Sequence, residues 1–73
     1  MKASDLNLGD FFTYYDKEYL CTYKGKYGVT SIDIYTHQPS PLSFRDTVEV
    51  SKVYPSKATS IEELRHLYPE FFI

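Results

Sequence analysis

Hydrophobic and polar residues alternate in short runs along most of this chain, between residues 11 and 53. The runs are rich in Phe, Tyr, Val, Ile and Thr, which is typical of β-strands because branched and aromatic side chains pack well on a pleated surface. The pattern predicts five short antiparallel strands, over residues 11–15, 19–24, 28–36, 42–44 and 48–53. Pro39 and Pro41 interrupt the pattern before the fourth strand, and we expect a loop there because proline cannot donate to a sheet ladder.

The alternation also predicts which side chains face the core. Successive side chains of a strand point to opposite faces, so Ile32 and Ile34 are expected in the core, and Asp33 is expected to be solvated or to cap a neighbouring loop. By the same rule, one face of the second strand should carry Tyr19, Cys21 and Tyr23. The connections are expected at residues 16–18 and 25–28, the latter with glycines that can adopt the positive φ angles of a hairpin turn.

The residues after the strands predict one short helix. Ser60 and Glu63 have the spacing of a capping box, in which the serine hydroxyl accepts from the glutamate amide and the glutamate side chain reaches back to the serine amide. Apolar residues then recur at helical spacing, namely Ile61, Leu64 and Leu67 or Tyr68. We expect Leu64 and Leu67 to pack on the sheet and Pro69 to end the helix.

Together these elements predict a mainly β fold with one C-terminal α-helix. The strands are too short and too few for two packed sheets, so we expect a small five-stranded antiparallel sheet that bends into a partly open barrel. The chain is short enough to be a single domain over residues 1–73, with the barrel over residues 6–53, the helix over residues 60–68 and a tail over residues 69–73.

The apolar end of the tail, Phe71-Phe72-Ile73, has two alternative roles. It can dock on the open end of the barrel, because a core this small needs apolar area. Part of it can also stay exposed and bind a partner or a second copy of the chain, as in a homodimer, because exposed apolar patches mark interaction sites.

Short motifs along the chain carry a family resemblance: Leu8-Gly9-Asp10-x-Phe12, Tyr19-Leu20, Ile34-x-Thr36, Leu42-Ser43-Phe44 and Thr47-Val48-Glu49-Val50. Over residues 6–50 the chain resembles small uncharacterised bacterial and phage proteins with Src-homology-3-like (SH3-like) barrels. The resemblance implies an SH3-like barrel and a small accessory binding protein, such as a phage or prophage protein that modulates a host factor. It implies no catalytic residues.

Charge and composition limit the possible settings. The net charge is −2, so the molecule as a whole does not attract polyanions. A single cysteine, Cys21, cannot form an internal disulfide, which is typical of a reducing compartment. Acidic residues interrupt the N-terminal segment and the apolar runs are short, so we expect neither a signal peptide nor a membrane span, and we expect a cytoplasmic protein.

The residue types used in catalysis are present without the necessary spacing. Cys21 lies in the middle of a predicted strand, where a free cysteine is usually a small core residue, and neither His37 nor His66 is near it in the pattern. The same three residues lack the spacing of a zinc site, and no helix follows the glycines to form a phosphate loop. We therefore expect a protein that is not an enzyme and that needs neither a metal nor another cofactor.

Exposed tyrosines are the predicted binding residues, because tyrosine is enriched at interface hot spots. The prediction is a protein-binding module whose contacts are Tyr15, Tyr23, Tyr27 and Tyr35. The alternative is a single-stranded nucleic-acid binder that uses Tyr19, Tyr23, Tyr27, Lys24 and Lys26, with rings against bases and lysines against phosphates. The negative net charge and the absence of an arginine from this stretch oppose the alternative.

Overall fold

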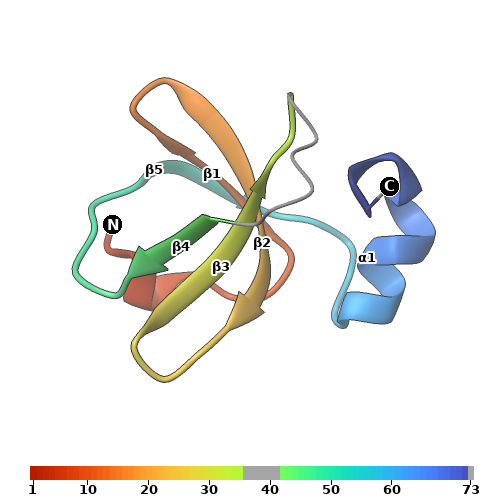
Figure 1. Ribbon diagram of the computed structural model, residues 1–73, viewed down its shortest axis with the longest axis horizontal. Helices are drawn as coiled ribbons and strands as arrows, with labels where there is room; N and C mark the ends of the chain where they lie inside the picture. Colours follow the sequence, from red (N-terminus) through yellow and green to blue (C-terminus); the bar gives the residue numbers. More distant parts are fainter. Residues whose placement is uncertain (36–41, 73) are drawn as a thin grey trace.

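The computed structural model confirms the mainly β fold, with one five-stranded antiparallel sheet and a short C-terminal helix (Figure 1). It describes residues 1–35 and 42–72; the predicted loop with His37, Pro39 and Pro41 lies outside them. The elements are the 3₁₀ turn η1 (Ala3–Asp5), β1 (Asp10–Tyr14), β2 (Lys17–Lys24), β3 (Gly28–Asp33), β4 (Leu42–Arg45), β5 (Ser51–Pro55), α1 (Ile61–Leu67) and the 3₁₀ turn η2 (Pro69–Phe72).

The strand order is β4-β3-β2-β1-β5, so four consecutive strands form a meander and the fifth returns to pair with the first. The sheet bends strongly. The bend is evident from contacts between side chains on strands that are not neighbours in the sheet. The ring of Phe44 on β4 lies 5.2 Å from that of Tyr14 and 5.3 Å from that of Phe12, both on β1. The bend therefore brings one edge strand over the middle of the sheet.

The first hairpin turn is tighter than predicted. Tyr15 and Asp16 form it alone, with φ angles of 48° and 64°. Two successive residues with positive φ give a turn whose twist matches that of the flanking strands. Lys17 and Glu18, expected in the connection, therefore belong to β2.

The glycines of the second hairpin do not supply the positive φ angles that the sequence predicts. Neither Gly25 nor Gly28 has a positive φ, and the Gly25 amide closes the turn by donating to the Gly28 carbonyl (2.8 Å). A Cβ atom at position 28 would overlap the carbonyl oxygen of Phe44. Glycine is needed there because it lets β3 and β4 approach closely.

The last strand begins later than predicted. The pattern predicts a strand over residues 48–53, whereas β5 runs from Ser51 to Pro55. The three preceding residues pair with the N-terminal segment instead; the amide of Ala3, for example, donates to the carbonyl of Val48 (2.8 Å). The N-terminal segment, and not β1, therefore lies beside residues 48–50.

Two hydrophobic cores lie on the two faces of the sheet. The N-terminal core, under η1 and β4, consists of Ala3, Leu6, Phe12, Tyr19, Cys21, Val29, Phe44 and Val50. The helix core, under α1, consists of Phe11, Leu20, Ile32, Ala58 and Leu64. Neighbouring residues of one strand, such as Phe11 and Phe12, thus enter different cores. This explains the runs of consecutive apolar residues in β1 and β2, since both faces of these strands are covered.

The faces of β2 and β3 agree with the predicted alternation only in part. Ile32 is buried and Ile34 is partly buried, as predicted. A register shift between Cys21 and Tyr23 interrupts the alternation of β2, and the tyrosine is 61% exposed while the cysteine is fully buried. Of the two predicted alternatives for Asp33, the second is confirmed: it is buried rather than solvated, and its carboxylate caps the turn after β3 by accepting from the backbone amide two residues on (2.9 Å).

The helix starts as predicted. The Ser60 hydroxyl accepts a hydrogen bond from the Glu63 amide (3.2 Å). The returning contact differs, because the Glu63 carboxylate accepts from the hydroxyl of Thr59 (2.7 Å) and not from the Ser60 amide. The α-helix ends at Leu67, before Pro69.

The apolar face of the helix is narrower than predicted. Leu64 is completely buried, whereas Leu67, also expected in the core, is 45% exposed. Tyr68 fills the space instead, with its ring edge-on to Phe11 at 5.6 Å. In the tail, Phe71 and Phe72 are partly buried and pack against the helix core, while Ile73 lies outside the described residues.

Candidate binding sites at the two ends of the sheet

The four tyrosines predicted to bind a partner are all exposed, but they do not form one surface. The exposed fractions of Tyr15, Tyr23, Tyr27 and Tyr35 are 84%, 61%, 73% and 70%. The first hairpin carries Tyr15 and the second carries Tyr27, and Figure 1 shows these two turns at opposite ends of the sheet. The strand between them, β2, is about 23 Å long at 3.3 Å per residue. Each end is therefore a separate candidate site.

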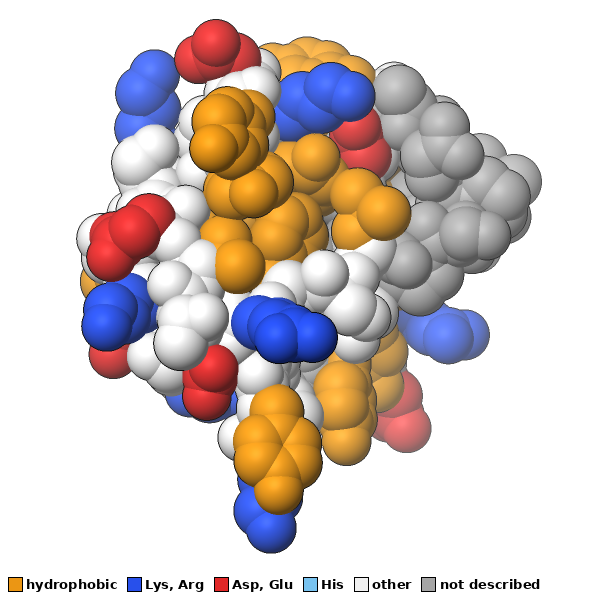
Figure 2. Space-filling view, turned by 60° about the vertical axis from the view of Figure 1, so that its left-hand side comes forward, with side chains coloured by type: hydrophobic (Ala, Val, Ile, Leu, Met, Phe, Trp, Pro, Cys, Tyr) orange, Lys and Arg blue, Asp and Glu red, His pale blue; other side chains and the backbone are white. Residues whose placement is uncertain are grey.

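The first site is a groove beside the first hairpin, here called the β1–β2 groove, with a volume of about 610 Å³. It is lined by Met1, Thr13, Tyr14, Tyr15, Val48, Glu49, Val50 and Ser51. It exists because β1 and the chain before β5 diverge after their last pair, Thr13 with Ser51. Figure 2 shows hydrophobic side chains gathered on this side of the molecule.

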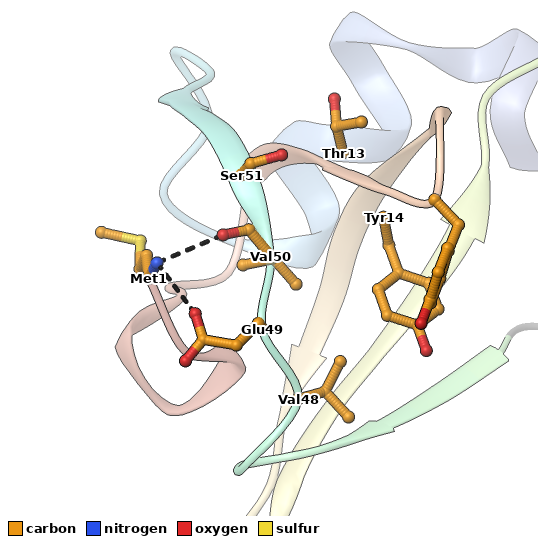
Figure 3. Close-up of a pocket in the computed structure, with 8 residues that line it drawn as sticks. Met1, Thr13, Tyr14, Val48, Glu49, Val50 and Ser51 are labelled. Carbon is orange, nitrogen blue, oxygen red and sulfur yellow. Dashed lines mark hydrogen bonds and ion pairs between the residues drawn. The ribbon is translucent and has the colours of Figure 1, made fainter.

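Aromatic and aliphatic side chains form the walls of the β1–β2 groove. Tyr14 lies across from Val48 (Figure 3) and is anchored below by its edge-to-face contact with Phe44. The ring of Tyr15 stands edge-on to that of Tyr14, with centroids 4.6 Å apart. The charged groups of the lining pair with each other, since the Met1 amino group lies 3.3 Å from the Glu49 carboxylate. The groove thus offers a mixed apolar and polar surface, and the charges of its lining residues are paired.

Tyr35 is near the same end of β2 but is not part of the groove lining. Its hydroxyl donates to the carboxylate of Glu18 (3.1 Å), and its amide donates to Asp33 (2.9 Å). The hydrogen bond to Glu18 is the main cause of the raised pKa of Tyr35. Tyr35 is therefore held against the start of β2 rather than beside Tyr15.

The second site is a smaller pocket of about 320 Å³ at the other end of the sheet, here called the hairpin pocket. It is lined by Tyr23, Gly25, Tyr27, Gly28, Val29, Thr30, Ser43, Phe44 and Arg45. Lys24 and Lys26 are exposed on the same hairpin, and the Lys26 ammonium lies 5.5 Å from the ring centroid of Tyr27. A hydrophobic and a basic side chain project together at the lower end of Figure 2.

Arg45 is the residue that the sequence pattern missed. It pairs with Gly28 across β3 and β4, and this pairing brings an arginine to the tyrosines and lysines of the hairpin. The stretch from residue 11 to residue 36 has no arginine of its own. Only the register between β3 and β4 could have identified it, because the spacing of residues along the chain does not show which residues pair across two strands.

Tyr19 is one of the residues predicted to contact nucleic acid, but its ring is not accessible to a base. It is only 5% exposed, and its ring stacks on Phe12 (5.5 Å) and stands edge-on to Phe44 (5.1 Å). Burial, with the nearby charge of Asp33, raises its pKa. The prediction that Tyr19 contacts a base is therefore wrong; the bend of the sheet places Phe44 over it.

Cys21 lies in the N-terminal core, completely buried, as predicted for a cysteine in the middle of a strand. Burial raises the pKa of its thiol from 9.0 to about 11. The thiol is therefore neutral near pH 7, and the thiolate that a nucleophile needs is not formed.

The raised pKa of Cys21 predicts a loss of stability at alkaline pH. The unfolded chain releases the thiol proton near pH 9, while the folded chain keeps it to about pH 11. Unfolding therefore becomes easier as the pH rises from 9 to 11, and the contribution is complete below pH 9. Urea unfolding at pH 8, 9, 10 and 11 should show a steeper fall for the wild type than for Cys21→Ala. Equal slopes would contradict the prediction.

The remaining candidate ligands do not gather. Within residues 1–35 and 42–72, no three side chains of His, Cys, Asp or Glu lie close enough to hold a metal ion. His66 is exposed on α1, and His37 lies outside the described residues.

Comparison with protein-family models, with curated proteins and with solved structures finds no match for this chain. Within the described part of the chain, the helices are too short and too polar to cross a membrane. Any function therefore has to be argued from the two sites themselves.

Proposed function

We propose that this chain is a non-enzymatic binding module that docks on another protein through the β1–β2 groove. The observation that carries the proposal is the pairing of the most exposed tyrosine, Tyr15, with a groove of about 610 Å³. This volume is within the usual range for binding pockets, about 300–1,000 Å³. An aromatic or aliphatic side chain of the partner is the expected occupant, because Tyr14, Tyr15 and Val48 line the groove and the charges of the lining are paired.

The geometry of the first hairpin supports this proposal. Tyr15 is held in a two-residue turn, and its ring leans on Tyr14, which packs on Phe44. An exposed anchor that is already ordered loses little conformational entropy when it binds. Tyrosine also combines a large apolar area with a hydroxyl that can bond to the partner.

The expectations about fold family, biological setting and location remain predictions. An SH3-like barrel, a phage or prophage accessory protein and a cytoplasmic location all rest on the sequence. A homodimer through Phe71, Phe72 and Ile73 would use the opposite side of the molecule. Phe71 and Phe72 are only partly buried against the helix core, so part of each ring is accessible.

The proposal can be tested with a library of displayed random peptides, selected on the immobilised protein. We expect enriched peptides with aromatic or aliphatic residues that bind the wild type and lose at least about 30-fold in affinity on Tyr15→Ala, which corresponds to a hot spot of about 2 kcal/mol. Tyr27→Ala is the matched control, since it removes another highly exposed tyrosine at the other end of the sheet. Peptides that bind Tyr15→Ala as well as the wild type, or no enriched peptides, would overturn the proposal.

A further inference from the structure

The hairpin pocket combines two exposed tyrosines with two glycines, which carry no side chain. Tyr23 and Tyr27 line it, and Gly25 and Gly28 leave room between them. The ring of Tyr23 lies over Gly25, where a Cβ atom would be 3.2 Å from the ring. The volume of about 320 Å³ is at the lower end of the usual range for small-molecule sites, about 300–1,000 Å³.

Three cations lie at this end of the sheet, and one of them, Arg45, lines the pocket. Lys24 on β2 pairs with Val29, and Arg45 on β4 pairs with Gly28, so both lie at the same end of the sheet, on strands separated by β3. Neighbouring strands are about 4.8 Å apart, so Lys24 and Arg45 start only about 10 Å from each other. Lys26 lies in the turn between β2 and β3. All three side chains are exposed.

These cations are not neutralised by carboxylates. The one ion pair between two described residues joins Met1 and Glu49, at the other end of the sheet. Asp46 follows Arg45 but does not pair with it; its amide donates to the carbonyl of Tyr27 (2.9 Å). A molecule with a net charge of −2 thus carries a local positive surface beside two tyrosine rings.

We propose that the hairpin pocket binds single-stranded nucleic acid, with bases stacked on Tyr23 and Tyr27 and the flanking phosphates on Lys24, Lys26 and Arg45. The assignment to nucleic acid depends on the presence of both the aromatic rings and the cations. An acidic peptide would use the cations but not the rings, whereas unpaired bases stack on aromatic side chains regardless of sequence. The hydroxyls of Thr30 and Ser43 line the same pocket and can bond to base edges or sugars.

This site is independent of the proposed protein-binding groove, because β2 separates them by its full length. Three phosphate contacts predict a salt dependence with a slope of about −2 for log K against log salt. Affinity should therefore fall by roughly 20-fold between 50 and 200 mM salt. The negative net charge makes this a local attraction rather than one of the whole molecule.

The test is fluorescence anisotropy with labelled twelve-residue oligonucleotides, dT and U, at 50 and 200 mM salt. We expect both to bind, Tyr23→Ala and Tyr27→Ala each to weaken binding at least about 5-fold, and Arg45→Ala to reduce the salt slope to about −1.4. The matched controls, Tyr15→Ala and Lys17→Ala, change exposed residues at the other end of β2 and should bind like the wild type. All five substitutions affect exposed side chains, and thermal unfolding checks that each variant is folded.

Three results would overturn the proposal. The first is no binding of either oligonucleotide at 50 mM salt. The second is equal binding of a polyglutamate of the same length, which would assign the site to an acidic protein. The third is a loss of binding in Tyr15→Ala equal to that in Tyr27→Ala, which would mean that the hairpin pocket is not the site. None of these results affects the peptide selection that tests the β1–β2 groove.

Discussion

Replacing Phe12 with alanine is expected to lower the free energy of unfolding by about 4 kcal/mol. The side chain is only 1% exposed, and its ring contacts those of Tyr19 and Phe44 at centroid distances of 5.5 Å and 5.3 Å. The substitution removes buried area and leaves a cavity among rings that belong to three different strands. A domain of this size has a total stability of only roughly 4–11 kcal/mol, so the variant should be close to unfolding at 25 °C.

Urea unfolding, followed by tyrosine fluorescence and by circular dichroism, measures the effect of Phe12→Ala. The control is Tyr15→Ala, which removes an aromatic ring that is 84% exposed and should change stability by no more than about 0.5 kcal/mol. A loss smaller than about 1 kcal/mol for Phe12→Ala would mean that the N-terminal core does not close around this ring.

Replacing Leu64 with alanine is expected to cost about 3 kcal/mol. Leu64 is completely buried in the helix core and is the one helix residue without exposed surface. A seven-residue helix is too short to be stable alone, so α1 depends on this contact for its place on the sheet.

Leu67→Ala is the matched control for Leu64→Ala, because both change the same residue type in the same helix. Leu67 is 45% exposed, and its replacement should cost less than about 1 kcal/mol. Both free energies come from the same urea titration. Equal losses for the two variants would contradict the placement of α1, and would instead support the helix face that the sequence pattern predicts.

The two predictions address separate cores, and neither core includes the binding tyrosines. Tyr15, Tyr23 and Tyr27 lie outside both clusters. Their substitution can therefore report on binding without first unfolding the protein. The same sheet holds a protein-binding groove at one end and a nucleic-acid pocket at the other in the functions proposed above.

Most of the secondary structure could be predicted from the order of residues along the chain, although β2 and β5 begin at other residues than predicted. Five strands, the capped start of α1 and its end before Pro69 follow from side-chain alternation, from Ser60 beside Glu63, and from proline chemistry. The burial of Cys21 was also predictable, since a free cysteine in the middle of a strand is usually a core residue. These features depend on residues that are close in the chain.

Which side chains are available for binding could not be predicted in the same way, because it depends on the packing of segments that are distant in the chain. Alternation assigns a residue to a face of its strand, but another element decides whether that face is covered. Phe44 covers Tyr19 because the sheet bends, and a register shift after Cys21 turns Tyr23 outward. Arg45 reaches the hairpin pocket through its pairing with β3. Such contacts join distant residues, and their register is set by the packing of the whole chain.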